Sequence, residues 1–279
     1  MINNNYIKKL SDYISNLNVV MFCPDDLEII KGSPIIRRNF LNIEIGQMYN
    51  KYIKLLNEYN KILKNRNEYL KLMSINNLTD KSYFDILTEK LIDLALDIYY
   101  YRKSFIDEIN EKIEKIYNNI TNNHGFCIAY NNFISNETIN RDLLKELLIK
   151  KYQNIYKKEL EQGNTLIGPH KDDILFYLDG QELKKFGSQG QQRAAILSLK
   201  LAEIEIFNDK LKNYPILLLD DIFSELDDNK KNNLIKYINL NYQTIITTTD
   251  INNIDDEILK KSKIFYVNNG LVTNYKEEV

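Results

Sequence analysis

Cysteine and long apolar runs are both scarce in this sequence. The two cysteines, Cys23 and Cys127, have no C-x-x-C spacing, which argues against a disulfide framework and a zinc site, so we interpret both as reduced thiols. No apolar run is long enough to span a membrane, and the first ten residues carry too many Asn and Lys for a secretory signal peptide. We therefore expect a cytoplasmic protein with no membrane partner.

An excess of basic charge is also missing. The chain has 37 Lys and Arg against 39 Asp and Glu, a formal net charge of -2 at pH 7, so any contact with DNA must come from a local patch. Hydrophobic residues make up 44% and charged residues 27% of the 279 residues. This composition is sufficient for a packed core in one large or two modest domains.

The string G-x-x-x-x-G-K-[ST], which marks a phosphate-binding loop, does not occur between Met1 and Val279. Two motifs that would follow such a loop are nevertheless present. In residues 186–193 (FGSQGQQR), small polar residues open a predicted helix, where unpaired backbone N–H groups and the helix dipole can hold a phosphate. Ser188 and Gly190 suit that task, although a plain Gly-containing turn is an open alternative.

The second motif is an apolar run that ends in two acids. Residues 215–219 (PILLL) have the length and flanks of a buried strand, and Asp220 and Asp221 follow directly. Carboxylates in this position could hold a hard divalent cation together with phosphate ligands. Two capping acids at the end of a strand are the simpler alternative.

The order of these motifs resembles the RecF family of ABC- and SMC-like ATPases. Residues 24–41 contain PDDL, GSP and RRNFL, which are similar to the first signature of the family, with Asn42 where an acid is expected. Residues 168–173 (GPHKDD) are similar to a family motif that usually has Arg at Lys171, and residues 218–234 fit the second signature. The resemblance spans nearly the whole chain. It also implies a preceding segment with the phosphate loop, so we expect this chain to begin after that segment.

The resemblance implies an α/β fold, namely an ABC-type ATPase head with a mostly parallel sheet and an inserted antiparallel helical-hairpin arm. Residues 1–46 would be the remainder of the N-terminal part of the head and residues 47–123 the arm. Residues 124–279 would form the C-terminal part of the head, with the signature, Walker B and D-loop motifs.

Apolar spacing of three and four supports the hairpin independently. One seam lies within a predicted helix at Gln47–Met73 and is interrupted by Arg66, and a second runs from Phe84 to Phe105, beyond which a stutter should unwind the supercoil. A packed helical subdomain and an arm that helps to embrace DNA are both open interpretations. In the head we predict strands at Val19–Cys23, Phe126–Tyr130, Asp173–Leu178, Gln181–Leu183, Ile216–Leu219 and Thr244–Thr248, and helices at Pro24–Ile30, Glu137–Leu160, Gln191–Leu211 and Asp228–Ile238.

By resemblance, the loop at 186–193 completes the nucleotide site of a partner subunit and not its own. Ser188, Gly190 and Gln191 would face the terminal phosphate of ATP across a homodimer interface. Gln192 and Arg193 would support the loop. Dimerisation that depends on ATP would then be part of the chemistry.

The same resemblance assigns Asp220 to Mg²⁺, usually through water, and places Asp221 where many relatives have a Glu that polarises the attacking water. Because Asp is one methylene shorter than Glu, we expect slow hydrolysis. Residues 224–227 (SELD) are similar to a D-loop, with Asp227 at the nucleotide. Thr249 or Asp250 would sense the terminal phosphate.

Two further groups of residues have competing interpretations. Arg37, Arg38, Lys51 and Lys54 lie near one end of the arm and could contact DNA phosphates, or they could simply be solvated. His170, with the acids of residues 172–173, could bind a metal as in a nuclease. A Gly-Pro turn that enters a strand explains this second group equally simply.

The resemblance implies an ATP-dependent clamp on single- and double-stranded DNA, acting in recombinational repair, replication restart and the SOS response. RecR and RecO would be its partners, and ATP and Mg²⁺ its ligands. The alternative is a nucleotide-incompetent fragment that serves only as a DNA-binding or interaction module. Because the phosphate-loop string is absent from this chain, enzymatic activity is left open.

Overall fold

The computed structural model describes residues 17–76, 81–134, 140–222, 226, 228–238, 242–249 and 256–273. Most of the predicted D-loop, including Asp227, lies outside the described residues, as does Asp250. None of the helices within the described ranges combines the length and apolarity needed to cross a bilayer.

A three-stranded parallel sheet carries the two adjacent acids. Its strands are β1 (Val19–Phe22), β5 (Ile216–Asp220) and β6 (Thr244–Thr247), in the order β1-β5-β6. Alternate residues of β5, Leu217 and Leu219, are fully buried, as expected for a strand covered on one face. The predicted parallel arrangement is confirmed for this sheet, and β5 lies at its centre.

A second, antiparallel sheet consists of β2 (Phe126–Asn131), β3 (Asp173–Leu178) and β4 (Gln181–Glu182). The predicted two-residue turn between β3 and β4 is confirmed, because Asp179 and Gly180 have φ values of 49° and 74°. Strand β4 stops one residue early, since Leu183 is buried and begins the short helix α6 (Leu183–Phe186). A small hairpin of β7 (Tyr266–Asn268) and β8 (Leu271–Thr273) lies near the C-terminus.

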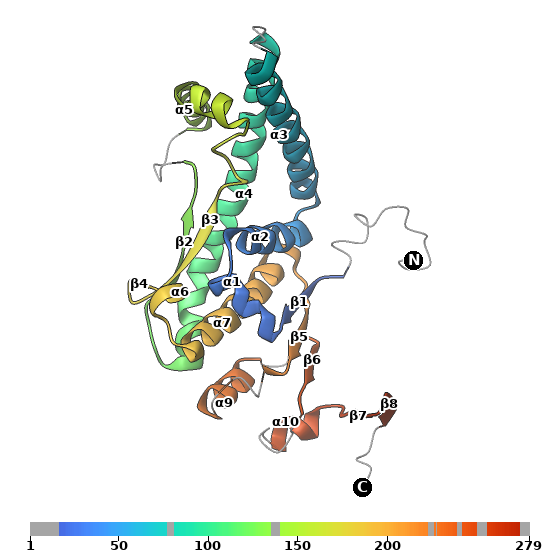
Figure 1. Cartoon of the computed structure of the whole chain (residues 1–279). Helices are drawn as coiled ribbons and strands as arrows, with labels where there is room; N and C mark the ends of the chain where they lie inside the picture. The colour runs from blue at the N-terminus through green and yellow to red at the C-terminus, as the bar shows by residue number, and fades with distance from the viewer. Residues whose placement is uncertain are drawn as a thin grey trace.

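Two long helices, α3 (Asn50–Asn76) and α4 (Ser82–Thr121), pack along each other in opposite directions, as the hairpin prediction requires (Figure 1). The first helix begins later than predicted, because Tyr49 has an extended backbone and separates α3 from α2 (Pro34–Met48). Helix α4 has 40 residues and is therefore about 60 Å long. It stays continuous through the predicted stutter, where its apolar residues are buried against α7 (Gln189–Leu211) and β2.

The remaining helices pack around the sheets and the α3–α4 hairpin. The predicted helix at Pro24–Ile30 is a 3-10 turn at Pro24–Leu27 followed by α1 (Glu28–Lys31). Helix α5 (Arg141–Gln162) packs beside the hairpin, whereas α9 (Asp228–Tyr237) and α10 (Asp256–Lys261) lie at the opposite end of the molecule (Figure 1). A connected apolar core extends from Val20 in β1 through α4 and α7 to Ile238. This core joins the hairpin to the sheet that carries the acids.

Candidate nucleotide and metal site

The predicted signature segment forms the exposed start of helix α7. Ser188 is the N-cap, and its side chain accepts a hydrogen bond from the backbone N–H of Gln191 at 3.3 Å. In return, the Gln191 side chain accepts a hydrogen bond from the Ser188 N–H at 2.8 Å, which completes a capping box. Ser188 is exposed, so the positive end of the α7 dipole lies at the molecular surface.

Gln192 holds the signature loop in place, and a lysine from another helix lies beside Gly190. Gln192 is only 4% exposed, and its side chain donates hydrogen bonds to the carbonyls of Leu183 and Gly187 at 2.8 and 3.2 Å. These bonds tie α7 to α6. At Gly190, an added Cβ atom would lie 3.8 Å from Nζ of Lys230 in α9, which is ordinary van der Waals contact. A lysine ammonium group therefore stands close to the helix start, and Arg193 is half-buried one turn further along.

Asp220 and Asp221 stand at the carboxyl end of β5, where the chain leaves the sheet. The hydroxyl of Thr247 in β6 donates a hydrogen bond to Oδ1 of Asp220 at 2.5 Å and accepts one from the N–H of Asp221 at 3.1 Å. Asp221 has a φ of 48°, a left-handed conformation that is uncommon outside glycine. Both acids are half-buried, so solvent and ligands can reach them.

The carboxylate oxygens of Asp220 and Asp221 fit a magnesium ion that is bound together with a nucleotide. Neighbouring carboxylates offer the hard oxygen ligands that Mg²⁺ prefers, and Mg²⁺ usually binds one or two carboxylates plus phosphate and water oxygens. Within the described part of the chain, no group of three or more His, Cys, Asp or Glu could hold a metal ion. The protein side chains alone therefore do not form a complete metal cage here.

The histidine of the GPHKDD motif is half-buried, and both of its ring nitrogens have partners within the protein. The Tyr59 hydroxyl donates to Nδ1 of His170 at 2.6 Å, and Nε2 of the same ring contacts the Thr165 carbonyl at 3.1 Å. Burial lowers the pKa of His170 to about 4. Asp172 is buried and binds Arg102 at 3.3 Å. The alternative of a metal cluster is therefore wrong, because both ring nitrogens and the carboxylate already have partners within the protein.

The structure separates the four cations that were predicted to contact DNA. Arg37 is 4% exposed and forms a bidentate ion pair with Asp173, with distances of 2.6 and 2.9 Å. This burial removes Arg37 from any DNA-contacting face, which corrects the prediction. Arg38 is half-buried and donates to the carbonyl of Asp172 at 2.8 Å, whereas Lys51 and Lys54 are exposed at the start of α3.

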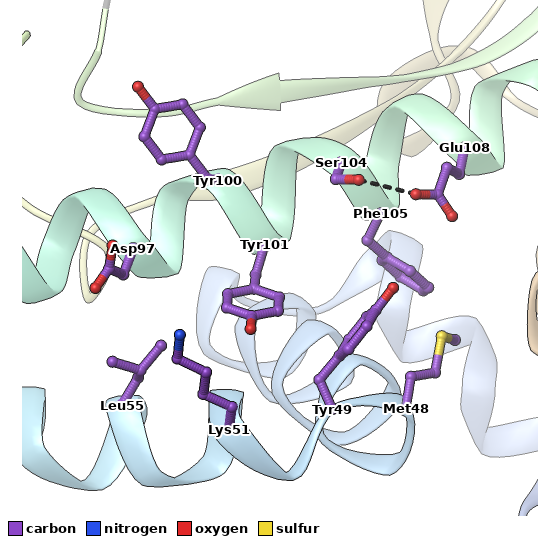
Figure 2. A pocket seen from close by; sticks show the side chains of 10 residues that line it. All are labelled: Met48, Tyr49, Lys51, Leu55, Asp97, Tyr100, Tyr101, Ser104, Phe105 and Glu108. Carbon is purple, nitrogen blue, oxygen red and sulfur yellow. Dashed lines mark hydrogen bonds between the residues drawn. The ribbon is translucent and has the colours of Figure 1, made fainter. Parts of the chain in front are cut away.

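Lys51 also lines a surface hollow of about 290 Å³. In Figure 2, the rings of Tyr49, Tyr101 and Phe105 lie between α4 and the segment that joins α2 to α3. At one end of the hollow, the Ser104 hydroxyl donates to a Glu108 carboxylate oxygen at 2.8 Å. Asp220, Asp221 and the signature loop do not line this hollow. The hollow is therefore separate from the candidate nucleotide site.

A parallel sheet with paired acids at the end of its central strand, an exposed helix start and an inserted helical hairpin define an ABC-type ATPase head. No protein-family model matches the chain. The DNA replication and repair protein RecF of Listeria monocytogenes is 44% identical over 266 residues, which are 95% of this chain and 72% of that protein. RecF of Ligilactobacillus salivarius is 40% identical over 273 residues, 96% of this chain and 72% of its own length. The chain belongs to the RecF family of DNA replication and repair proteins.

A solved structure supports the same conclusion. The recombination mediator protein RecF of the RecFOR pathway, described with ATP, matches with a TM-score of 0.83 and 30% sequence identity. The match covers 97% of this chain and 71% of that one. The family predicted from the motifs and the ATPase-head fold are therefore confirmed.

Two residues at the site were missed by the sequence analysis. Thr247 contacts both acids, whereas the prediction named Thr249 or Asp250 as the sensor of the terminal phosphate and gave Thr247 no contact with the acids. The register of the parallel strands could have identified it, because Thr247 pairs directly with Asp220. No pattern in the sequence indicates that Lys230 lies at the site, because its position beside Gly190 depends on how α9 packs.

Proposed function

We propose that two copies of this chain together form each ATP site, with each copy contributing part of the residues. ATP binding would then close the two copies around DNA. The observation that carries the proposal is the arrangement at the end of the central parallel strand, where Asp220 and Asp221 share the hydroxyl of Thr247. Ligands of open parallel sheets bind at the carboxyl ends of the strands. The RecF structure described with ATP supports ATP as this ligand.

Each copy would contribute residues to two ATP sites, its own and that of the other copy. Asp220 would hold Mg²⁺ in its own copy, and the Asp221 carboxylate would orient the attacking water. Ser188, Gly190 and Gln191 would face the nucleotide of the other copy. This division is supported by the exposure of Ser188 and by the position of the α7 helix start, where positive partial charge favours a phosphate.

Within the proposed site, Gln192 and Arg193 support the signature loop and do not contact the nucleotide. Gln192 already bonds two carbonyls of the preceding turn. Asp227 is proposed to join the site through the D-loop. The chain contains no phosphate-loop string, and its match spans 72% of the length of the Listeria relative.

We extend the proposal to DNA and to protein partners. The RecFOR pathway named for the matching structure supports RecO and RecR as partners in recombinational repair, replication restart and the SOS response. Lys51 and Lys54 are exposed on α3, and Arg38 is half-buried on α2. Because phosphate contacts by such cations release counterions, binding to DNA should weaken as salt rises.

The test combines this chain with a separate polypeptide, the part of the Listeria relative that lies outside the match. We propose that this part carries the phosphate loop, and we call it the phosphate-loop polypeptide. ATP binding is measured by equilibrium dialysis with and without Mg²⁺, for the chain alone and for the complex. We expect binding only in the complex and only with Mg²⁺. If the complex forms but binds no ATP, the nucleotide-incompetent module is the better description. If the two polypeptides do not associate, a single-chain fusion decides the question by the same criterion.

A further inference from the structure

Thr247 occupies the last position of β6, directly opposite Asp220 in the parallel register. The two residues are thus held as a cross-strand pair at the point where both strands leave the sheet. Thr247 is exposed, so the packing of the core does not explain why a hydroxyl stands here. Its contacts are with the two acids of the proposed metal site.

The direction of these hydrogen bonds follows from the donors that are present. The backbone N–H of Asp221 can only donate, so the Thr247 oxygen must accept that bond at 3.1 Å. A hydroxyl has a single proton, which is then donated to Oδ1 of Asp220 at 2.5 Å. One Asp220 oxygen is therefore fixed as an acceptor. A carboxylate has about four lone-pair sites, so the group keeps acceptor capacity for a cation or its water ligands.

The backbone at Asp221 gives a second reason for the hydroxyl. A left-handed conformation is strained for most residues other than glycine, and strained residues persist only where their surroundings hold them. Asp221 has a φ of 48°, and its N–H is bonded to Thr247. The same side chain thus holds the carboxylate of the first acid and the turned backbone of the second.

From this geometry we infer that Thr247 is the positioning residue of the metal site, fixing the Asp220 carboxylate and the turn at Asp221. The inference rests on the proposed function for the identity of the site. Mg²⁺ requires nearly ideal octahedral geometry, so a carboxylate with a fixed orientation binds the hydrated ion better than one that rotates. Thr247 itself does not contact the nucleotide.

Three variants of the full chain separate this role from a general structural role. Thr247→Val removes the hydroxyl but keeps the shape and the strand propensity. Thr247→Ser keeps the hydroxyl. Thr244→Val makes the same chemical change in the same strand, three residues earlier and opposite Leu217 instead of Asp220. All three are expected to fold.

The first readout needs no nucleotide. Crystal structures of Thr247→Val should show the Asp220 carboxylate turned and Asp221 outside the left-handed region, whereas Thr247→Ser and Thr244→Val should retain the original geometry. The Asp221 amide should exchange about fivefold faster in Thr247→Val, the effect of losing one hydrogen bond of ordinary strength. Unchanged geometry and exchange in Thr247→Val would overturn the inference.

The second readout is the Mg²⁺ concentration that gives half-maximal ATP binding in the complex with the phosphate-loop polypeptide. Thr247→Val should raise this concentration about tenfold, a change that corresponds to about 1.4 kcal/mol, and the two other variants should not change it. An unchanged value in Thr247→Val would contradict the positioning role. If the unmodified complex binds no ATP, the proposed function fails, and the structures and amide exchange still decide whether Thr247 holds the acids.

Discussion

Arg66 and Glu159 form an ion pair of 2.6 Å in which neither side chain is more than 1% exposed. Arg66 lies on α3 and Glu159 on α5, so the pair joins the hairpin to the helix beside it. The Arg66 guanidinium also donates to the hydroxyls of Thr88 and Thr165 at 2.9 and 2.6 Å. Arg66, the charged residue that interrupts the apolar seam, therefore connects α3 to α4, to α5 and to the loop after α5.

Replacement of Arg66 by Met should strongly destabilise the fold. The change leaves Glu159 as a buried carboxylate without its cation, which typically costs about 3–5 kcal/mol. The free energy of unfolding in urea measures this loss. The matched control is Lys64→Met, because Lys64 pairs with Glu68 at 3.9 Å on the surface, with exposed fractions of 77% and 60%. The control should change stability by less than about 0.5 kcal/mol, and equal effects for both variants would refute the buried connection.

His170 should make the fold less stable in mild acid. Burial lowers its pKa from 6.5 to about 4, so the unfolded chain takes up a proton at a higher pH than the folded protein does. The contribution of His170 is complete above pH 6.5 and is lost as the pH falls toward 4. The shift corresponds to at most about 3 kcal/mol. Urea unfolding at several pH values measures it.

The control for this prediction is His170→Asn, which removes the titrating ring but can accept the Tyr59 hydroxyl proton. The buried Asp172 acts in the opposite sense, because burial raises its pKa from 3.8 to about 6 and its carboxyl therefore favours the folded state as the pH falls. Asp172 is common to both proteins, so it cancels in the comparison. If the difference in stability between the two proteins does not change between pH 6.5 and 4, the account of His170 is incorrect.

Gly190→Glu should block ATP-dependent dimerisation without unfolding the chain. The Cβ atom at this position meets only the end of a flexible lysine at 3.8 Å, so a side chain fits, but a carboxylate would repel the phosphates of the opposite copy. Gly190→Ala is the control and should dimerise normally. Sedimentation with ATP and Mg²⁺ in the presence of the phosphate-loop polypeptide tests both variants. Normal dimerisation of Gly190→Glu would place the interface elsewhere.

Local patterns were sufficient to predict much of the fold. The Asp-Gly turn, strand β3 and the capped start of α7 depend on neighbouring residues, and their limits were predicted within two residues. Two-residue alternation and three-to-four spacing are properties of single elements. The sequence therefore contained enough information for the strands of the central sheet and for the paired helices of the hairpin.

Partners that lie far apart in the chain could not be predicted in this way. Arg37 was expected on a DNA-contacting face, but its partner Asp173 lies 136 positions away and draws the side chain into the interior. The role of Arg66 likewise depends on Glu159, 93 positions away. Thr247 was missed because its contacts with the acids require the register between β5 and β6. In each case tertiary packing, and not local pattern, decides the role of the side chain.

The central claim is that two copies share each ATP site, and a mixing experiment tests it most directly. Asp220→Ala and Gly190→Glu, each with the phosphate-loop polypeptide, should hydrolyse no ATP alone. In an equimolar mixture, each mixed dimer has one intact site, because the signature loop of the Asp220→Ala copy faces the unmodified acids of the Gly190→Glu copy, so turnover should return. A mixture as inactive as its components, although mixed dimers form, would contradict a site shared between two copies.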